Sequence, residues 1–121
     1  MSSNVHRVLV FGGRNYNHYA VVAWALDAFF TSNGGAFVVI EGGALGADRM
    51  GRMWARSKGL PVITMAADWG SYAKSAGHIR NQWMIDHARP TYAIGFPGGA
   101  GTADMTNKLL KADIPLWLPQ A

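Results

Sequence analysis

The sequence contains no cysteine, which excludes disulfides and thiolate metal sites. It is also poor in charge, since only 15% of its 121 residues are Asp, Glu, Lys or Arg. Its longest apolar segment, residues 20–30, includes Asp27 and is too short to cross a bilayer. The polar opening, residues 1–7, lacks the apolar region of a secretory signal. We therefore expect a cytoplasmic protein that makes no membrane contact.

Hydrophobic residues, in contrast, are abundant. Half of the residues are hydrophobic, and five of them are tryptophan. A single domain of this length has limited room to bury so much apolar surface, so we expect a homo-oligomer that covers part of it. The formal net charge of +4 at pH 7 is compatible with a phosphate-bearing ligand or with nucleic acid, and it requires neither.

Short apolar runs alternate with helical segments along the whole chain. The runs predict strands at residues 7–11, 37–40, 61–65, 91–96 and 114–118. The segments between them predict helices at residues 20–30, 47–58, 78–88 and 102–112. The first helix is apolar nearly all round, so we expect it to be well buried.

This alternation predicts the fold class. We expect one α/β domain over residues 1–121, a small doubly wound, Rossmann-like parallel sheet of about five strands with helices on both faces. An α+β fold with a mixed sheet is the alternative, and the regular alternation disfavours it.

Glycine-rich loops follow the first four predicted strands. They read GGRNY, EGGALGAD, ADWGSYAKSAG and FPGGAGTADM in chain order. Parallel strands bring all four loops to the same edge of the sheet, where doubly wound folds bind their ligands. The loops at the opposite edge carry ordinary stop signals, so the candidate functional residues are concentrated at one edge.

The segment PGGAGT, residues 97–102, has the chemistry of a phosphate cradle. A helix start leaves N–H groups without partners, glycines let them approach an anion, and Thr102 adds a hydroxyl. The alternative is a glycine turn with Thr102 as a plain N-cap. Neither a Walker A sequence nor a G-x-G-x-x-G after the first strand is present, which disfavours ATPase and dinucleotide dehydrogenase chemistry.

Four ordered segments carry a family resemblance: GGRNY (12–16), GGALGAD (42–48), AGHIRNQWM (76–84) and FPGGAGTADM (96–105). They resemble the YspA-like branch of the SLOG superfamily over nearly the whole chain, from Val8 to about Leu116. The resemblance implies a Rossmann-like domain that binds nucleotides or nucleotide-derived ligands.

The related LOG phosphoribohydrolases cleave the N-glycosidic bond of nucleoside 5′-monophosphates. Their motifs are P-G-G-x-G-T-x-x-E and R-K-x-x-M, which are matched here by Pro97, Gly98, Gly99, Gly101, Thr102, Arg80 and Met84. Asn81 replaces the lysine of the second motif, and Met105 stands in place of the final glutamate. Leu45 and His78 also depart from the arginine and proline expected in the YspA-like branch. The resemblance therefore implies nucleotide binding more strongly than hydrolysis.

Several single residues admit two interpretations. Arg80 is a phosphate ligand or a surface ion pair, and its place in the motif favours the ligand. Arg14 is a ligand for phosphate or base, or an exposed loop arginine. Asp48 and Glu41 are candidate acceptors for ribose hydroxyls. The alternative for Asp48 is a carboxylate at a helix start that complements the helix dipole. Asp104, the carboxylate nearest to the missing glutamate, is an acceptor for ribose hydroxyls or an acid/base group, and the alternative is a first-turn carboxylate that complements the helix dipole.

Other side chains yield weaker predictions. Trp69 and Tyr72 in the third loop are candidates for base stacking, although packing is the commoner role of such aromatics. The four histidines lack metal-ligand spacing, so we expect neither a metal site nor a cofactor. Arg49, Arg52 and Arg56 align on one helical stripe, which we interpret as a solvated face; a nucleic-acid contact is the alternative, because the protein DprA contains a related SLOG-type domain.

The main hypothesis is a sensor or ligand-binding module for a nucleotide or an ADP-ribose-like compound. A LOG-like phosphoribohydrolase that uses Arg80 and Asp104 is the first alternative, and a single-stranded nucleic-acid binder is the second. The predicted ligand-binding residues are Gly12, Gly13, Arg14, Gly42, Gly43, Gly46, Asp48, Arg80, Asn81, Pro97, Gly98, Gly99, Gly101 and Thr102.

Overall fold

The structure, a computed structural model, describes residues 5–67 and 76–120. In this part of the chain, five parallel strands form one sheet in the order β3-β2-β1-β4-β5. The strands are β1 (Arg7–Phe11), β2 (Val38–Glu41), β3 (Val62–Thr64), β4 (Tyr92–Gly95) and β5 (Leu116–Trp117). The predicted α/β fold with a parallel sheet is therefore confirmed, and the mixed-sheet alternative is wrong.

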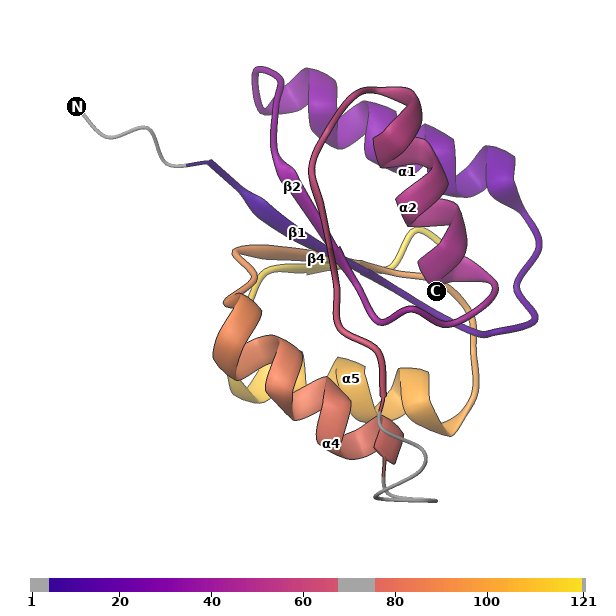
Figure 1. Cartoon of the computed structure of the whole chain (residues 1–121), viewed down its shortest axis with the longest axis vertical. Coiled ribbons are helices and arrows are strands. Elements are labelled where there is room, and N and C mark those ends of the chain that lie inside the picture. The colour runs from indigo at the N-terminus through magenta and orange to yellow at the C-terminus, as the bar shows by residue number, and fades with distance from the viewer. Residues whose placement is uncertain (1–4, 68–75, 121) are drawn as a thin grey trace.

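Helices cover both faces of this sheet (Figure 1). One face carries α1 (Tyr19–Ser32) and α2 (Ala47–Ser57). The other face carries α4 (Ala76–Trp83), the π-helical segment η2 (Met84–Ala88) and α5 (Ala100–Lys111). In the described residues, no helix is both long and apolar enough to cross a membrane.

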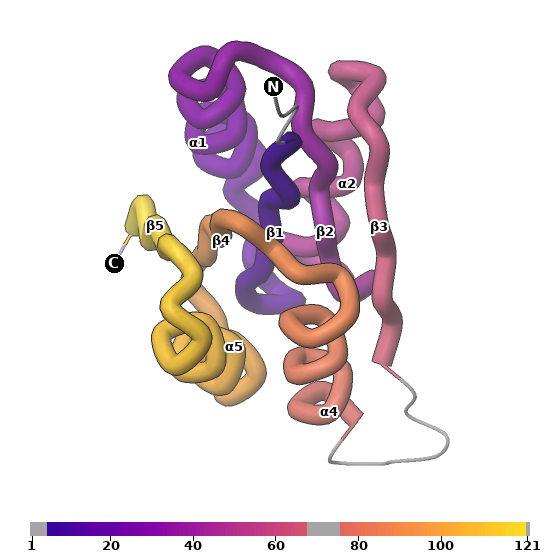
Figure 2. Tube along the Cα trace, turned by 90° about the vertical axis from the view of Figure 1, so that its left-hand side faces the viewer, coloured from indigo at the N-terminus to yellow at the C-terminus, as the bar shows by residue number. Residues whose placement is uncertain are grey.

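The chain reverses its direction of travel across the sheet between β1 and β4. It starts in the centre with β1, moves outward to β2 and β3, and then returns to place β4 and β5 on the other side of β1 (Figure 2). β1 and β4 are hydrogen-bonded neighbours, in register from Val8↔Tyr92 to Phe11↔Gly95. Their following loops lead to helices on opposite faces, which opens a crevice at the carboxyl ends of the two strands.

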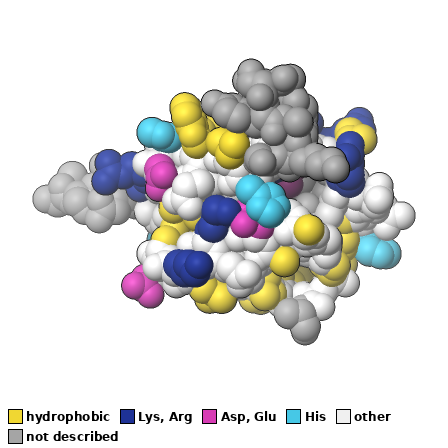
Figure 3. Space-filling model, turned by 90° about the horizontal axis from the view of Figure 1, so that it is seen from below, with side chains coloured by type: hydrophobic (Ala, Val, Ile, Leu, Met, Phe, Trp, Pro, Cys, Tyr) yellow, Lys and Arg dark blue, Asp and Glu magenta, His cyan; other side chains and the backbone are white. Residues whose placement is uncertain are grey.

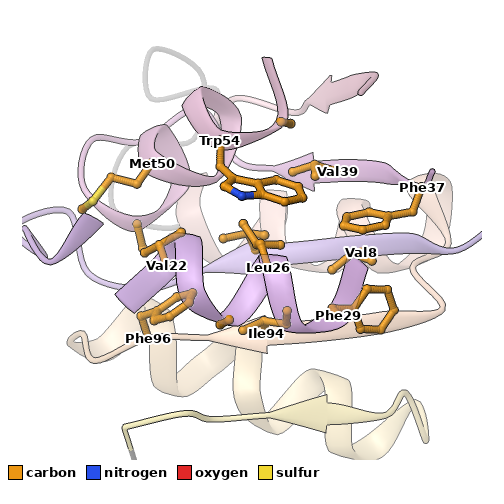
Figure 4. Packing of buried hydrophobic residues seen from close by; sticks show 14 residues of the cluster. Val8, Val22, Leu26, Phe29, Phe37, Val39, Met50, Trp54, Ile94 and Phe96 are labelled. Atoms are coloured by element: carbon orange, nitrogen blue, oxygen red, sulfur yellow. The ribbon is translucent and has the colours of Figure 1, made fainter. Parts of the chain in front are cut away.

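Alternation along β1 divides the hydrophobic core into two parts. Val8 and Val10 belong to the cluster under α1 and α2, where Trp54 stacks on Phe37 with ring centroids 5.7 Å apart (Figure 4). Leu9, which lies between them on β1, faces the other way and packs in the second cluster, under α4 and α5. Both faces of the sheet are thus buried under helices, which explains why its strands are continuously apolar.

Two predicted helices differ from the observed ones. The helix expected at residues 20–30 buries only one face, and Trp24 on its other face is 58% exposed. The helix expected at residues 78–88 is α4 followed by the π-helical η2, which ends at Arg89 in the left-handed region (φ 54°). Because Pro90 disfavours the α conformation in the residue before it, the helix has to end there.

Candidate functional site

A cavity of about 850 Å³ lies at the crevice between β1 and β4. Its walls are the loop after β1, the loop after β2, the start of α4 and the loop that leads into α5. The cavity therefore occupies the edge where the glycine loops were expected to meet. Of the predicted ligand-binding residues, all but Gly42 and Gly46 line it, whereas the candidates Glu41 and Asp104 do not.

The glycines around this cavity divide into two groups. Some let the loops pack on one another: an added Cβ at Gly46, where φ is 76°, would overlap with the carbonyl oxygen of Gly13. An added Cβ at Gly98 would likewise lie 2.6 Å from the backbone nitrogen of Gly13. At Gly99 and Gly101, in contrast, an added Cβ would meet nothing within 4 Å among the described residues. Those two glycines face open space and leave the backbone accessible.

The start of α5 provides hydrogen-bond donors at the cavity. Gly99 is the N-cap residue and supplies no side-chain cap, and the first intrahelical bond runs from Ala103 N–H to its carbonyl oxygen at 3.0 Å. The N–H groups of residues 100–102 precede that bond, so they have no acceptor within the helix. Thr102 is not the N-cap, and its Oγ1 lies over Gly98 instead. This helix start has the polarity that an anionic group requires.

Arg80 reaches from α4 across the cavity edge to the loop after β2. Its Nη1 donates to the carbonyl oxygen of Gly42 at 2.6 Å, and its Nε donates to Oδ1 of Asn81 at 3.1 Å. Burial lowers the pKa of Arg80, while the nearby carboxylates of Asp48 and Glu41 act to raise it. An arginine guanidinium stays protonated in proteins, so Arg80 supplies a fixed cation at the cavity.

Asn81 joins Arg80 to the start of α5. Its side chain is 3% exposed, and its Nδ2 donates to the carbonyl oxygen of Gly101 and to Oδ2 of Asp104, both at 3.1 Å. Its Oδ1 accepts from Arg80. Asn81 also lines the cavity. Because these contacts occupy most of the Asn81 amide group, we interpret Asn81 as a residue that positions Arg80 and the start of α5.

Asp48 lies in the first turn of α2 and is 4% exposed. One carboxylate oxygen, Oδ2, accepts from the backbone N–H of Gly42 at 3.0 Å and of Ala44 at 3.4 Å. Burial raises the pKa of Asp48 to about 6, although the charge of Arg80 and the two backbone hydrogen bonds act in the opposite direction. Of the predicted acidic residues, Asp48 is the one that lines the cavity.

The carboxylate of Asp104 is engaged by neighbouring side chains and lies outside the cavity lining, where an acid/base group was expected. Both of its oxygens accept from Lys108 Nζ, at 2.5 and 2.6 Å, and Oδ1 lies 3.4 Å from His78 Nδ1. Burial acts to raise the pKa of Asp104, but the hydrogen bonds from Lys108 and Asn81 and the charges of Lys108 and His78 hold it below its ordinary value. Met105, not Asp104, lines the cavity.

Glu41 and Arg52, one residue of the arginine stripe, pair with each other inside the protein. The Glu41 side chain is completely buried and accepts from the backbone of Gly43, from Arg52 Nη1 at 2.9 Å and from the hydroxyl of Thr64. Arg52, the middle residue of the stripe, therefore anchors α2 to β2. Arg49 and Arg56 are exposed, in agreement with the solvated-face interpretation.

Several cavity residues were not predicted from the sequence. Phe11, Met84 and Met105 supply apolar wall, and residues 15–18 extend the loop after β1 along one side. In a sequence, apolar residues at the end of a strand or on a helix are interpreted as core residues. Only the fold shows that these three also line the cavity. The predicted stacking residues Trp69 and Tyr72 lie outside the described residues. Among the residues that the structure describes, no three His, Asp or Glu side chains gather as metal ligands.

Comparisons with known proteins agree with the motif resemblance. The family model described as the YspA, cpYpsA-related SLOG family matches residues 6–72. The chain is also 34% identical over 119 residues to Gene 61 protein of Mycobacterium phage D29, which covers 93% of this chain and 94% of that protein. No solved structure matches the chain significantly. With a family match over more than half of its length, the chain belongs to the YspA, cpYpsA-related SLOG family.

Proposed function

We propose that this protein is a binding module, or sensor, for a nucleotide or an ADP-ribose-like nucleotide derivative. The observation that carries the proposal is the uncapped start of α5 with Arg80 beside it, on one cavity at the carboxyl edge of a doubly wound sheet. N–H groups without an acceptor inside the helix, a positive helix end and a fixed cation together favour a phosphate group. Membership of the SLOG family supports the same ligand class.

The cavity has room and surface for more than a phosphate. Its volume of about 850 Å³ lies within the range of cofactor and nucleotide pockets. Phe11, Met84 and Met105 offer apolar wall to a sugar or a base, and Arg14 and residues 15–18 surround one side. A mixed lining of this kind suits a ligand with a charged end and a flat, partly apolar end.

Two observations favour binding over phosphoribohydrolase chemistry. The carboxylate nearest to the family's glutamate position, Asp104, is held by Lys108 and Asn81 outside the cavity lining. Its lowered pKa also makes it a weak proton acceptor. We therefore expect no release of free base when the protein is incubated with nucleoside monophosphates, as chromatography of the mixture can establish.

Isothermal titration calorimetry tests the binding proposal. The probes are AMP, ADP, ADP-ribose, adenosine and inorganic phosphate. We expect at least one phosphorylated nucleotide to bind, adenosine to bind more weakly than AMP, and Gly101→Val to weaken nucleotide binding, because its side chain fills the open space at the start of α5. Asn107→Val, on an exposed position of the same helix, is the matched control and leaves binding unchanged. If none of the nucleotides binds the wild-type protein, the proposal is wrong.

A further inference from the structure

Two different helices carry the positive groups of the cavity. Arg80 belongs to α4, which precedes β4, and the N–H groups without an acceptor inside the helix belong to the start of α5, which follows β4. A guanidinium and a helix start act on the same anionic group only if their relative position is fixed. The contacts between α4 and α5 therefore decide whether these two groups work together.

The side chain of Asn81 connects the two helices. Its Nδ2 donates to the carbonyl oxygen of Gly101 and to Oδ2 of Asp104, both at 3.1 Å. Gly101 lies in the first turn of α5, so one of these hydrogen bonds is made at the helix start itself. Oδ1 of Asn81 accepts from Nε of Arg80, also at 3.1 Å. Both ends of one buried amide thus join Arg80 to α5.

The groups around this amide determine its orientation. An asparagine amide has two orientations, which exchange its donor nitrogen and its acceptor oxygen. Burial acts to raise the pKa of Asp104, but hydrogen bonds from Lys108 and Asn81 hold it below its ordinary value, so the group is an ionised acceptor at neutral pH. The carbonyl oxygen of Gly101 is likewise only an acceptor. Both groups require the nitrogen of the amide, which leaves its oxygen for the donor Nε of Arg80.

Asp104 is itself held in place on α5. Both of its oxygens accept from Nζ of Lys108, one turn further along the helix, at 2.5 and 2.6 Å. His78 Nδ1 lies 3.4 Å from Oδ1, the oxygen that does not contact Asn81. The Asp104 side chain is only 17% exposed. Oδ2 therefore presents an acceptor to Asn81 from a fixed position.

From this arrangement we propose that Asp104 is a positioning residue, which acts through Asn81 to fix the guanidinium of Arg80 relative to the start of α5. The bond from Nη1 of Arg80 to the carbonyl oxygen of Gly42 fixes the same guanidinium at a second point. Asp104 lies outside the cavity lining, so its effect on a ligand is indirect. That effect rests on the proposed function, whereas the orientation of Arg80 is a property of the ligand-free protein.

NMR spectroscopy of the ligand-free protein tests the orientation directly. The probe is the ¹H–¹⁵N signal of Arg80 Nε, which is identified by its loss in Arg80→Lys. We expect this proton to exchange slowly with water in the wild-type protein and in Asp104→Asn, which keeps a side-chain oxygen for Nδ2 of Asn81. In Asp104→Ala, which removes that acceptor, we expect a shifted signal and faster exchange. Asp86→Ala, which removes an exposed carboxylate bonded to Gln82, is the matched control and leaves the signal unchanged.

Calorimetry with AMP and adenosine measures the consequence for binding. Asp104→Ala should weaken AMP binding by about 3- to 30-fold, the range for residues that act on a site from outside it. Asp104→Asn should bind AMP nearly as tightly as the wild-type protein, although it loses the ion pair with Lys108. Adenosine lacks the phosphate that Arg80 is proposed to contact, so its affinity should be the same in all three proteins. An equal loss for AMP and adenosine in Asp104→Ala belongs to a general structural role and overturns the inference.

The outcomes separate this inference from the proposed function. If AMP, ADP and ADP-ribose all fail to bind the wild-type protein, the proposed function is wrong, and the ligand-free NMR comparison still decides whether Asp104 orients Arg80. If nucleotides bind but the Arg80 signal is the same in Asp104→Ala as in the wild-type protein, the ligand site stands and the positioning role is wrong. The wild-type protein alone provides a further test if the variant does not fold. Rapid exchange of its Asn81 side-chain amide protons, at the rate of an exposed amide, contradicts the proposal.

Discussion

At the scale of single residues, two buried carboxylates on neighbouring segments behave differently. Glu41 is matched by a cation, a hydroxyl and a backbone N–H, so its charge is compensated inside the protein. Asp48 has two backbone N–H groups on one oxygen, and burial still raises its pKa to about 6. The first arrangement is that of a structural ion pair. In the second, burial disfavours the charged form of the carboxyl in the ligand-free protein.

We predict that Asp48→Asn stabilises the ligand-free protein at neutral pH. Because the folded-state pKa of Asp48 is about 6 and its ordinary value is 3.8, ionising this carboxyl costs stability as the pH rises between these values. Asparagine avoids that cost, so the variant gains roughly 1–3 kcal/mol in free energy of unfolding at about pH 8. Urea denaturation over a pH series measures the gain.

The same pH series contains its control. Near pH 4 both side chains are neutral, so the wild-type protein and the variant should have almost equal stability. The difference then grows as the pH rises and levels off above about pH 7. A variant that is less stable than the wild-type protein at every pH would show that the Asp48 charge is compensated after all.

Breaking the Glu41–Arg52 pair should have a large cost. Glu41→Ala leaves the partly buried Arg52 without its partner and removes the acceptor of Gly43 N–H. We expect a loss of about 3–5 kcal/mol in free energy of unfolding, as for other buried pairs deprived of one member. The double variant Glu41→Met with Arg52→Met should recover most of the loss. If the double variant is no more stable than Glu41→Ala, the cost comes from packing and not from the unpaired charge.

The sequence could identify these residues as candidates but could not assign their roles. Asp48 and Arg80 were predicted at the site from their places after a glycine loop and in a motif, and both line the cavity. Asp104 was an equally reasonable candidate, because a carboxylate stands one position from the family's glutamate. The Asp104 carboxylate is engaged by Lys108, which lies one turn further along α5, and by Asn81, which the packing of α4 on α5 brings to it. Such partners are set by tertiary structure.

At the scale of elements, α5 begins earlier than the capping signal predicted. Thr102 is the kind of residue that caps helices, and the helix was therefore expected to start there. The helix instead starts at Ala100 after Gly99, and the hydroxyl of Thr102 lies next to Gly98. The first residues of this helix start, Gly99, Ala100 and Gly101, line the cavity.

Two glycine substitutions should have opposite effects on stability. Gly101→Ala places a methyl group in open space within the first turn of α5, so we expect a gain of about 0.5–1 kcal/mol from the lost backbone entropy of the unfolded chain. Gly46→Ala forces a side chain onto the carbonyl oxygen of Gly13 at a positive φ of 76°, so it should cost more than about 2 kcal/mol.

Thermal unfolding monitored by circular dichroism measures both changes. An unchanged melting temperature for Gly46→Ala would mean that the loops after β1 and β2 do not pack as closely as the structure has them. A destabilised Gly101→Ala would mean that the space at the start of α5 is occupied. The two variants therefore test, in the same assay, the division of the glycines into packed and open ones.

At the scale of the whole molecule, the fold was predictable because its signal is repeated. Each of the first four apolar runs is followed by a glycine-containing loop and then a helix, and an error in assigning any one of these units would leave the alternation unchanged. The regular pattern also placed the site, since parallel strands bring their following loops to one edge. The contacts between loops, such as Gly13 with Gly46 and Gly98, connect residues far apart in the sequence, and no local pattern predicts them.

Self-association of the whole chain stays a prediction. Large hydrophobic side chains are exposed on both layers, among them Trp24 on α1 and Trp83 at the end of α4, each more than half exposed. On the face formed by α4 and α5, hydrophobic side chains lie among charged and polar ones (Figure 3). Trp24 itself packs beside Trp117 of the edge strand β5, with ring centroids 5.5 Å apart. Aromatic residues of this size at the surface are typical of interfaces.

We therefore expect sedimentation equilibrium to give a mass that is a multiple of the 13.1 kDa chain. Trp24→Lys and Trp83→Lys place a charge on opposite layers of the molecule, so each tests one face, and the variant that lowers the mass identifies the interface. Both residues lie outside the cavity lining, so neither substitution should alter nucleotide binding directly. A wild-type mass of 13.1 kDa at every concentration would contradict the prediction, and the exposed tryptophans would then be a tolerated feature of a monomer.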